Sequence, residues 1–399
     1  MNQDAHSQSG LSGEQSPPAW PRPLRLMIAG AGTGGHLFPA IAVAEEIMRM
    51  FPGSRVMFVT TGRPIEQTVL AGRSFEIAQI SAGGLKGMGL LQKGRSLMLL
   101  PRGFWKSLGL IRSFAPDAVL GMGGYSAAPV ILAAFLRRVP RLIHEQNRIA
   151  GMTNQWLSRL ARRVLVSFED TRISCRSGKI RFTGHPVRRQ IREVAENRGM
   201  AVHEGRKKLF TVAVLGGSQG ARRINTAVVE AFSQIKEPGR FFVIHQTGPH
   251  DEESVRRAYV RMGVDSAVSA FFRDMASVYE QADLAVCRAG AATLAEIAAV
   301  GLPALLVPYP YAADNHQVHN AEVLVKAGAA EMISEKDLSP PWLAEYLQAC
   351  ADNAGGRFEK ACLSARSLGR PRAAAAVINE ILEAAGRKRF LDSSNTQEY

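Results

Sequence analysis

The sequence predicts an α/β protein built from two doubly wound domains whose parallel sheets face a common cleft. Apolar runs of strand length alternate with helix-spaced segments and Gly-rich turns, which is typical of parallel sheets covered by helices on both faces. This pattern starts at Arg25, stops in the charged stretch 188–208 and restarts at Phe210. A length of 399 residues suits two large domains, at about 150 residues per domain.

Composition excludes several classes of protein. With 46% hydrophobic and 21% charged residues, the chain can bury a core and is not disordered as a whole. Its 4 cysteines are widely scattered, which favours reduced thiols and argues against a zinc site. Residues 1–23 are polar and Pro-rich, so we expect a disordered tail and no signal peptide. Apolar stretches such as 127–136 are shorter than the roughly 20 residues of a membrane-spanning helix.

The first domain is expected over residues 24–187. It begins with the strand RLMIAG (25–30), followed by a helix from Phe38 to Phe51 whose apolar residues recur at helical spacing. Five further buried strands are predicted at 55–60, 75–80, 117–123, 141–146 and 164–168. Helical stretches separate most of them, so a parallel sheet covered by helices on both faces is expected.

The second domain is expected over residues 209–368, after a linker at 188–208. Its strands are predicted at 210–217, 241–248, 268–272, 284–290 and 303–310, each followed by a helical segment. A C-terminal helix within 369–387 is expected to pack back toward the first domain, followed by a tail at 388–399. Ligands of open α/β sheets bind beyond the carboxyl ends of the strands, which places a site between the two domains.

The first strand runs into GAGTGGH (30–36), which fits G-x-G-x-x-G between a strand and a helix. Glycines there let backbone N–H groups approach a phosphate at the positive end of a helix. A dinucleotide site also needs an acidic residue about 20 positions later, and the second strand ends in Thr60-Thr61-Gly62 instead. A tight turn without a ligand is the alternative.

Two turns in the second domain have the same character. LGGSQGA (215–221) lets Ser218 donate to a phosphate, and RAGAATLAE (288–296) leaves a helix N-terminus open with Glu296 one turn inside. Glu296 could bind ribose hydroxyls or be an exposed helix residue. Since no D-x-D occurs in the chain, a leaving diphosphate would need helix dipoles and a cation, for which Arg188 is the candidate. Alternatively, Arg188 belongs to a solvated basic run.

His36 closes the first Gly-rich loop and is the first candidate for a general base. An imidazole with a pKa near 6.5 suits the deprotonation of a sugar hydroxyl, although a capping role is the alternative. HEQN (144–147) offers Glu145 as a second candidate base and Asn147 as a cleft residue. The turn GMGGYSAAP (121–129) adds the phenol or ring face of Tyr125.

Positive charge is concentrated in one segment. The formal net charge is +14, and residues 81–163 hold 13 Lys and Arg against two acidic residues. Within 84–114 these cations alternate with Leu, Phe and Trp, which fits the headgroup region of an anionic bilayer better than nucleic acid. Part of this apolar content is expected in the first domain's core.

The motifs GTGGH, GMGGY, HEQN, GHPVR, GGSQGA, RAGAATLAE and PYPYAADNHQVHNA occur together and in order. In this combination the chain resembles the peptidoglycan N-acetylglucosamine transferases of glycosyltransferase family 28, from about Leu24 to Ala384. The resemblance implies a GT-B fold of two Rossmann-like domains and an inverting transfer without metal or cofactor. It also implies UDP-GlcNAc as donor, lipid I as acceptor, lipid II as product, and a peripheral place on the cytoplasmic face of the cell membrane, with possible cell-wall synthesis proteins as partners.

The resemblance also implies roles for individual residues. In the second domain, the donor diphosphate and ribose are expected at Arg188, Ser218, Ala291, Ala292, Thr293, Leu294, Ala295 and Glu296. Gln317 is expected at the GlcNAc hydroxyls and Phe272 near the uracil. In the first domain, Thr33, Gly34 and Gly35 are expected at the acceptor diphosphate, Asn147 in the cleft, and His36 as the base. Phe272 stands where the family commonly has a smaller aliphatic residue, and His316 where some members have glutamine.

Three alternatives remain open at this stage. A UDP-GlcNAc 2-epimerase or a soluble-acceptor transferase shares the expected fold but does not need the apolar and basic surface expected within 84–114. A nicotinamide or flavin oxidoreductase fits GAGTGGH but lacks the acidic residue after the second strand. A membrane-surface adaptor without activity leaves the many phosphate-type loops unexplained.

Overall fold

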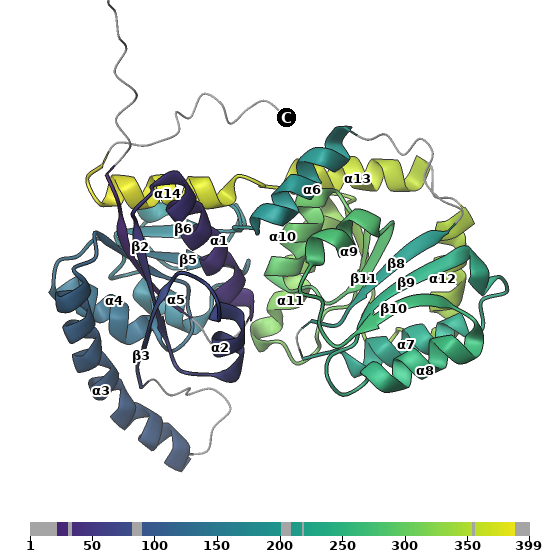
Figure 1. Ribbon diagram of the computed structural model, residues 1–399, viewed down its shortest axis with the longest axis horizontal. Helices are drawn as coiled ribbons and strands as arrows, with labels where there is room; N and C mark the ends of the chain where they lie inside the picture. Colours follow the sequence, from purple (N-terminus) through teal and green to yellow (C-terminus); the bar gives the residue numbers. More distant parts are fainter. Residues whose placement is uncertain are drawn as a thin grey trace, which may run out of the picture.

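The computed structural model describes residues 22–387, except 31–33, 82–89, 201–208, 218 and 353–355. Several sequence predictions lie outside these residues: both terminal tails, Thr33, Ser218 and the first part of the basic segment. The described chain forms two α/β domains side by side (Figure 1). This confirms the predicted fold class of two doubly wound domains.

The first domain is built on a parallel sheet of seven strands. Their order is β3 (Glu76–Gln79), β2 (Arg55–Thr60), β1 (Arg25–Ala29), β4 (Ala118–Gly121), β5 (Arg141–Glu145), β6 (Arg163–Val166) and β7 (Ile180–Phe182). Strands β2 and β3 are added on one side of β1, and the strands from β4 onward are added on its other side. Such a switch point, here between β1 and β4, opens a crevice at the carboxyl ends of the two strands.

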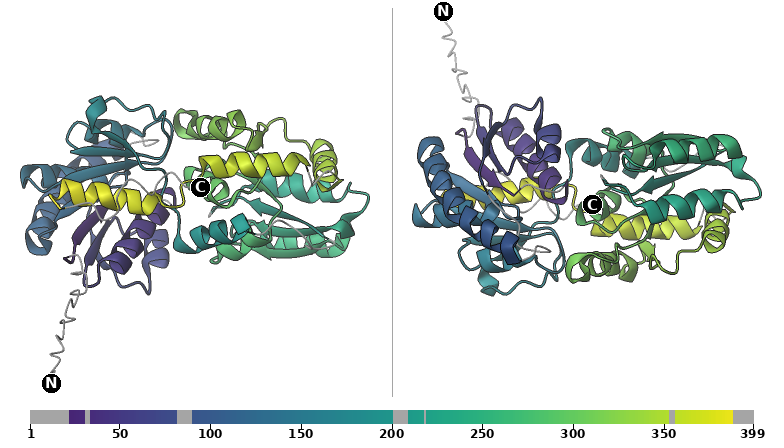
Figure 2. Two further views of the ribbon diagram at one scale, coloured as in Figure 1. Left: turned by 90° about the horizontal axis from the view of Figure 1, so that it is seen from above. Right: turned by 90° about the horizontal axis from the view of Figure 1, so that it is seen from below.

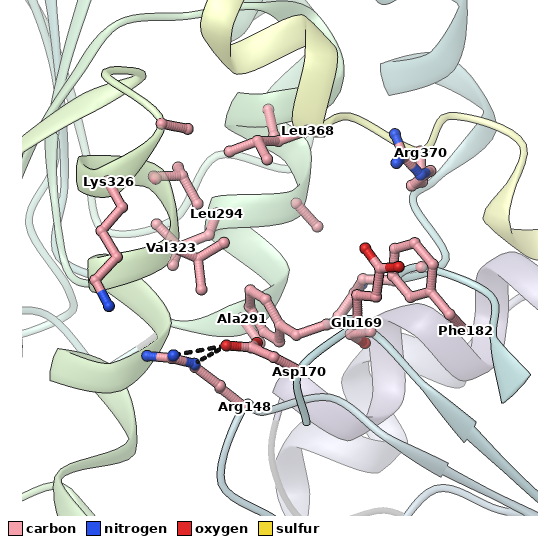
Figure 3. A pocket seen from close by; sticks show the side chains of 18 residues that line it. Arg148, Glu169, Asp170, Phe182, Ala291, Leu294, Val323, Lys326, Leu368 and Arg370 are labelled. Atoms are coloured by element: carbon pink, nitrogen blue, oxygen red, sulfur yellow. Dashed lines mark hydrogen bonds and ion pairs between the residues drawn. The ribbon is translucent and has the colours of Figure 1, made fainter. Parts of the chain in front are cut away.

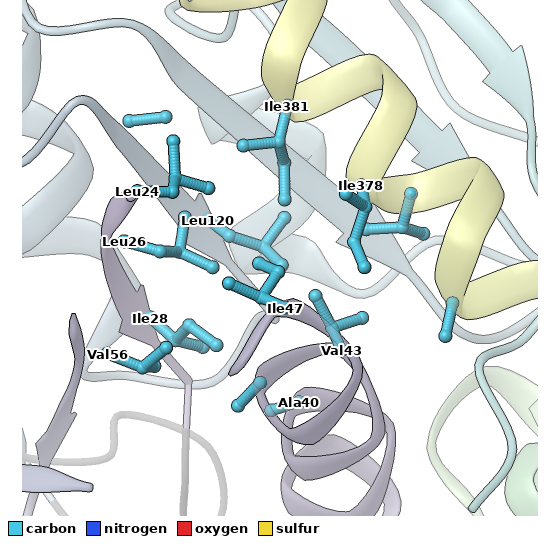
Figure 4. Packing of buried hydrophobic residues seen from close by; sticks show 14 of the residues in the cluster. Leu24, Leu26, Ile28, Ala40, Val43, Ile47, Val56, Leu120, Ile378 and Ile381 are labelled. Atoms are coloured by element: carbon cyan, nitrogen blue, oxygen red, sulfur yellow. The ribbon is translucent and has the colours of Figure 1, made fainter. Parts of the chain in front are cut away.

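Alternate residues of β1 supply two cores. Leu26 and Ile28 pack toward α1 (Gly34–Met50) and α14 (Ala373–Ala384), as Figure 4 shows. Met27 and Ala29 face the other side of the sheet, where the core includes residues of α3 (Leu90–Phe114) and α4 (Ala127–Leu136). The domain's remaining helices are α2 (Pro64–Leu70) and α5 (Met152–Leu157), with the 3-10 turn η1 (Ser177–Lys179). Among the described residues, no helix is both long and apolar enough to span a membrane.

The second domain repeats the arrangement with a parallel sheet of six strands. Their order is β10 (Asp265–Ser269), β9 (Phe241–Gln246), β8 (Phe210–Leu215), β11 (Leu284–Cys287), β12 (Ala304–Leu306) and β13 (Ala330–Met332). The switch point lies between β8 and β11. The helices are α7 (Arg222–Phe232), α8 (Glu252–Met262), α9 (Met275–Gln281), α10 (Ala291–Val300), α11 (His316–Lys326), α12 (Pro340–Asp352) and α13 (Gly356–Leu368).

The chain crosses between the domains twice. After β7, residues 183–188 lead into α6 (Arg189–Met200), whose Ile191 and Val194 are buried in the second domain's core. The stretch 188–208 was expected to be a linker. Its first part instead forms a helix, because Ile191 and Val194 give this highly charged segment an apolar side that packs on the second domain. The second crossing, 369–372, returns the chain to α14, which lies across the first domain (Figure 2). There, Glu380 and Glu383 form ion pairs with Arg163.

Candidate active site

The first switch point brings two Gly-rich turns together. Gly30 directly follows β1 with φ of 134°, and a Cβ there would lie 2.7 Å from the Cβ of Met122. Only glycine allows this approach. A Cβ at Gly123 would lie 3.3 Å from both His36 Nε2 and Asn154 Nδ2, so the His36 ring lies against the second turn. Gly34 and Gly35 form the first turn of α1 beside it.

Burial, with a smaller contribution from the neighbouring charge of His316, lowers the pKa of His36 to about 4. His316 is the first residue of α11 in the second domain, so this electrostatic interaction acts across the interdomain boundary. A histidine with this pKa is neutral at pH 7. It can therefore accept a proton from an acceptor hydroxyl.

Glu145, the second candidate base, is 1% exposed at the end of β5. Its carboxylate accepts hydrogen bonds from Asn147 N (2.9 Å), Asn147 Nδ2 (3.3 Å), Gly151 N (3.1 Å) and Asn154 Nδ2 (2.8 Å). Burial raises the pKa of Glu145, and these four donors oppose that shift. The carboxylate is thus engaged in holding the loop 147–151.

Glu145→Gln tests this assignment. An amide cannot accept from all four donors, because its NH₂ group would face N–H groups. We expect a loss of about 1–3 kcal/mol in the free energy of unfolding and a higher KM, since Asn147 loses its support. The pH profile of kcat should keep its shape. Urea unfolding and pH-dependent kinetics check this result, and disappearance of the acidic limb of kcat would return Glu145 to the role of base.

The loop after β5 also joins the two domains. Asn320 of α11 donates to Asn147 Oδ1 (3.0 Å) and accepts from Arg148 N (2.9 Å). Arg148 forms ion pairs with Asp170 (2.6 Å) and with Glu322 (2.8 Å). Asn147, which was expected in the cleft, therefore lies at the contact between the two domains.

A buried ion pair joins Arg188 to Glu296 near the N-terminus of α10 in the second domain. Arg188 donates through Nε (3.1 Å) and Nη2 (2.8 Å) to Glu296 Oε1, while Tyr279 donates to Glu296 Oε2 (3.0 Å). The side chains of Arg188 and Glu296 are 15% and 10% exposed. This burial excludes two of the alternatives that the sequence left open. Glu296 is not an exposed helix residue, and Arg188 is not part of a solvated basic run. The Arg188 guanidinium also lies over the Phe38 ring of α1 (5.1 Å).

The other expected donor residues are engaged with their own domain. Gln317 Oε1 accepts from Tyr309 N (2.9 Å), and Phe272 N donates to Gln246 Oε1 (3.1 Å). Backbone contact of Phe272 N with a uracil would therefore require Gln246 to move. Ala291, Ala292, Thr293, Leu294 and Ala295 form the first turns of α10, capped by Gly290. Tyr125 is half-buried in the turn after β4.

The site includes residues that the sequence did not single out. Tyr279, Asn154 and Asn320 each hold a predicted site residue in place. Asn320 lies within the motif PYPYAADNHQVHNA, which was a usable signal. Tyr279 gave none, because its spacing on α9 is that of an ordinary core residue. Over the described residues, no group of three His, Cys, Asp or Glu side chains is arranged to hold a metal ion.

Three histidines are buried without an acidic partner. Burial lowers the pKa of His144 to about 4 and those of His185 and His245 to about 3. His245 is held between Asn225 Oδ1 (3.1 Å) and the Tyr259 hydroxyl (2.9 Å) beneath the turn after β9. All three side chains are therefore neutral in the folded protein at neutral pH.

Acid is expected to destabilise the protein through these histidines. Between pH 6.5 and about 4 the unfolded chain binds more protons, so the free energy of unfolding falls as the pH is lowered. Each histidine contributes up to about 1.4 kcal/mol per pH unit in this window. Urea unfolding at several pH values measures the slope. His245→Gln should reduce the slope, whereas His250→Gln, at an exposed site, should not; a flat profile from pH 6.5 to 5 would contradict the expectation.

Comparison with known proteins gives consistent matches. The model of the glycosyltransferase family 28 N-terminal domain matches residues 26–166, and that of the C-terminal domain matches residues 211–370. Curated relatives include a UDP-N-acetylglucosamine–N-acetylmuramyl-(pentapeptide) pyrophosphoryl-undecaprenol N-acetylglucosamine transferase of Geobacter sulfurreducens. It is 42% identical over 363 residues, which cover 90% of this chain and 98% of the relative. The enzyme of the same name from Syntrophus aciditrophicus is 44% identical, covering 82% and 89%.

Solved structures extend the comparison. The crystal structure of Acinetobacter baumannii MurG aligns with a TM-score of 0.71 and 30% identity, covering 90% of this chain and all of that one. UDP-GlcNAc 2-epimerase from Neisseria meningitidis, solved with UDP-GlcNAc, aligns with a TM-score of 0.62 and 14% identity, again covering 90% and 100%. At that identity, the second likeness concerns the fold alone.

Proposed function

The chain belongs to glycosyltransferase family 28 and transfers N-acetylglucosamine from UDP-GlcNAc to lipid I, giving lipid II; we propose that it does so with inversion and without a metal ion. The observation that carries the proposal is the pairing of two opposed half-sites. A neutral His36 lies at the first domain's switch point, and the buried Arg188–Glu296 pair lies at the helix N-terminus of the second.

The donor half-site is assigned to the second domain. Arg188 uses Nε and Nη2 on Glu296, so its Nη1 is the group we assign to the leaving diphosphate. The N–H groups of the first turn of α10 add the positive end of the helix dipole, and Ser218 is assigned to the same phosphates. Glu296 Oε1 accepts twice from Arg188, whereas Oε2 accepts only from Tyr279 and keeps a second lone pair, which can accept a ribose hydroxyl. Gln317 is assigned to the sugar and Phe272 to the uracil.

The acceptor half-site is assigned to the first domain. Thr33, Gly34 and Gly35 bind the acceptor diphosphate, and Asn147 and Tyr125 orient the muramyl sugar. The muramyl C4 hydroxyl gives its proton to His36, and its oxygen forms the bond to C1 of GlcNAc. The bond between C1 and the phosphate oxygen breaks, and its electron pair leaves with UDP, whose charge Arg188 and α10 stabilise. Attack opposite the leaving group inverts the sugar.

A membrane-facing surface is assigned to α3 and α4, on the cytoplasmic face of the cell membrane. Trp105 of α3 is 70% exposed, and Leu132, Phe135 and Leu136 of α4 are exposed as well. Arg102 and Lys106 on α3, with Arg137 and Arg138 after α4, add positive charge. Apolar side chains among cations suit an anionic bilayer, which carries the lipid acceptor.

The stereochemistry and metal dependence of transfer test the proposal. UDP-GlcNAc and a lipid I analogue are incubated with EDTA, and the product's anomeric proton is read by NMR. We expect undiminished transfer and a β-linked product from the α-linked donor. Loss of transfer in EDTA that Mg²⁺ restores, or an α-linked product, would refute the metal-free inverting mechanism.

A further inference from the structure

A cavity lies between the domains, on the far side of α10 from Glu296. Its volume is about 570 Å³, which is in the range of small-molecule sites. Ala291, Leu294, Ala295 and Ala298 line it, and their spacing of three and four residues defines one face of α10. Glu296 lies well outside that face and points to Arg188 and Tyr279. The cavity is therefore distinct from the assigned ribose contact, and the side chains of Ala291, Leu294 and Ala295, which were expected at the donor, line this cavity instead.

Both domains and both crossings form the walls. Leu294, Val323 and Lys326 stand on the second domain's wall, opposite Phe182 and Glu169 of the first, and Arg370 comes from the second crossing (Figure 3). Gly184 of the first crossing also lines the cavity; a Cβ there would lie 2.6 Å from the Cβ of Arg370. The Arg148–Asp170 ion pair closes one end. Any change in the angle between the domains must therefore alter this cavity.

The lining has the chemistry of a site for an amphipathic anion. Leu294, Val323, Leu368 and the half-exposed Phe182 supply the apolar surface. Lys326 and Arg370 form no ion pair with another described residue; Arg370 Nη1 donates to the carbonyls of Ser367 (3.0 Å) and Gly369 (2.9 Å), and its guanidinium lies over the Phe182 ring (5.4 Å). Neither positive charge is therefore neutralised by a carboxylate of these residues. His185 and Ser167 also line the cavity, and His185 is only 5% exposed. The buried atoms His185 Nε2 and Ser167 Oγ have no hydrogen-bond partner. Buried polar groups of this kind are normally satisfied.

We propose that this interdomain cavity binds a small molecule with an apolar body and one anionic group, and that the bound molecule restrains domain closure. The apolar body packs against Leu294, Val323 and Phe182, and the anionic group pairs with Lys326 or Arg370. An occupant in contact with both domains fixes their separation. Transfer then slows because closure orders the donor and excludes water. The donor still binds, since the occupant leaves the Arg188–Glu296 side of α10 free.

The binding test uses anilinonaphthalene sulfonate, a fluorescent apolar anion of suitable size. Wild-type protein is expected to bind it saturably, and Val323→Trp, which fills the cavity, should weaken binding about tenfold or more. Leu368→Trp serves as a second filling variant if the first does not fold. Lys326→Glu with Arg370→Glu should also weaken binding, whereas Arg257→Glu with Arg261→Glu, the same charge change on α8, should not.

A control variant separates the cavity from the exposed apolar surface of α4. Phe135→Glu should leave the cavity-dependent binding intact. The proposal is overturned if no saturable binding is found, or if binding survives both filling variants and is lost in Phe135→Glu. These binding measurements do not depend on catalytic activity. A negative result in them is therefore distinguishable from failure of the proposed function.

The kinetic test asks what the bound probe does. We expect the probe to lower kcat with little change in the KM for UDP-GlcNAc, and the filling variants to resist this inhibition. If the probe instead competes with UDP-GlcNAc, the cavity is part of the donor site and the inference of a separate site fails.

Discussion

His36→Ala is expected to lower kcat by about 10²–10⁴-fold while leaving the dissociation constant for UDP-GlcNAc almost unchanged. The ring lies against Gly123 at the first domain's switch point, whereas the groups assigned to the donor belong to the second domain or the first crossing. Its removal should therefore cost proton transfer and not donor binding. Steady-state kinetics with a lipid I analogue, together with calorimetric titration of UDP-GlcNAc, separate the two quantities. His250→Ala, at an exposed histidine, is the matched control.

The pH profile sharpens this result. His36 with a pKa of about 4 stays unprotonated, and so able to act as a base, until the pH falls toward that value. The acidic limb of kcat/KM is expected well below pH 6.5, and His316→Gln should move it upward because the opposing charge is removed. An unchanged kcat in His36→Ala would contradict the assignment and leave water or another group as the base.

Glu296→Ala is expected to be the most destabilising change in the site. It leaves the Arg188 guanidinium, whose side chain is 15% exposed, without its carboxylate partner. Breaking a buried pair in this way costs about 3–5 kcal/mol of the free energy of unfolding. Donor affinity should fall as well, since the assigned ribose contact is lost. Urea unfolding and donor titration measure the two effects on the same variant.

A double variant distinguishes the structural role of the pair from its role in binding. Arg188→Ala with Glu296→Ala removes both charges and should recover part of the lost stability, but no donor affinity. Tyr279→Phe, which removes only one hydrogen bond to Glu296, should cost about 1 kcal/mol and have a smaller effect on the donor. Donor affinity that recovers in the double variant would show that the pair only holds the fold.

Much of the fold could be predicted because its signals are local. Strands such as β1 and β8 are continuous apolar runs that end in glycines, and the restart at Phe210 marks the second domain. The short strand β13 was not recognised as a sheet strand, since three residues carry little pattern and join the sheet by pairing with β12. The helix α6 was obscured by its charged face.

The chemistry of the site could be predicted only in part. The Gly-rich turns and His36 follow directly from strand ends, so their place at the switch point was foreseeable. The Arg188–Glu296 pair joins residues 108 positions apart, and no spacing rule in the sequence points to it. The four donors to Glu145 also arise from the folded loop. What the sequence cannot display is how buried polar groups find partners across elements.

The fate of labelled UDP-GlcNAc tests the central claim most directly. Purified protein is incubated with UDP-GlcNAc labelled in the sugar and a lipid I analogue, and all labelled products are separated. The account predicts labelled lipid II formed in equal amount with UDP. Conversion of the label into an epimerised nucleotide sugar, or its release as free sugar with no labelled lipid, would contradict it.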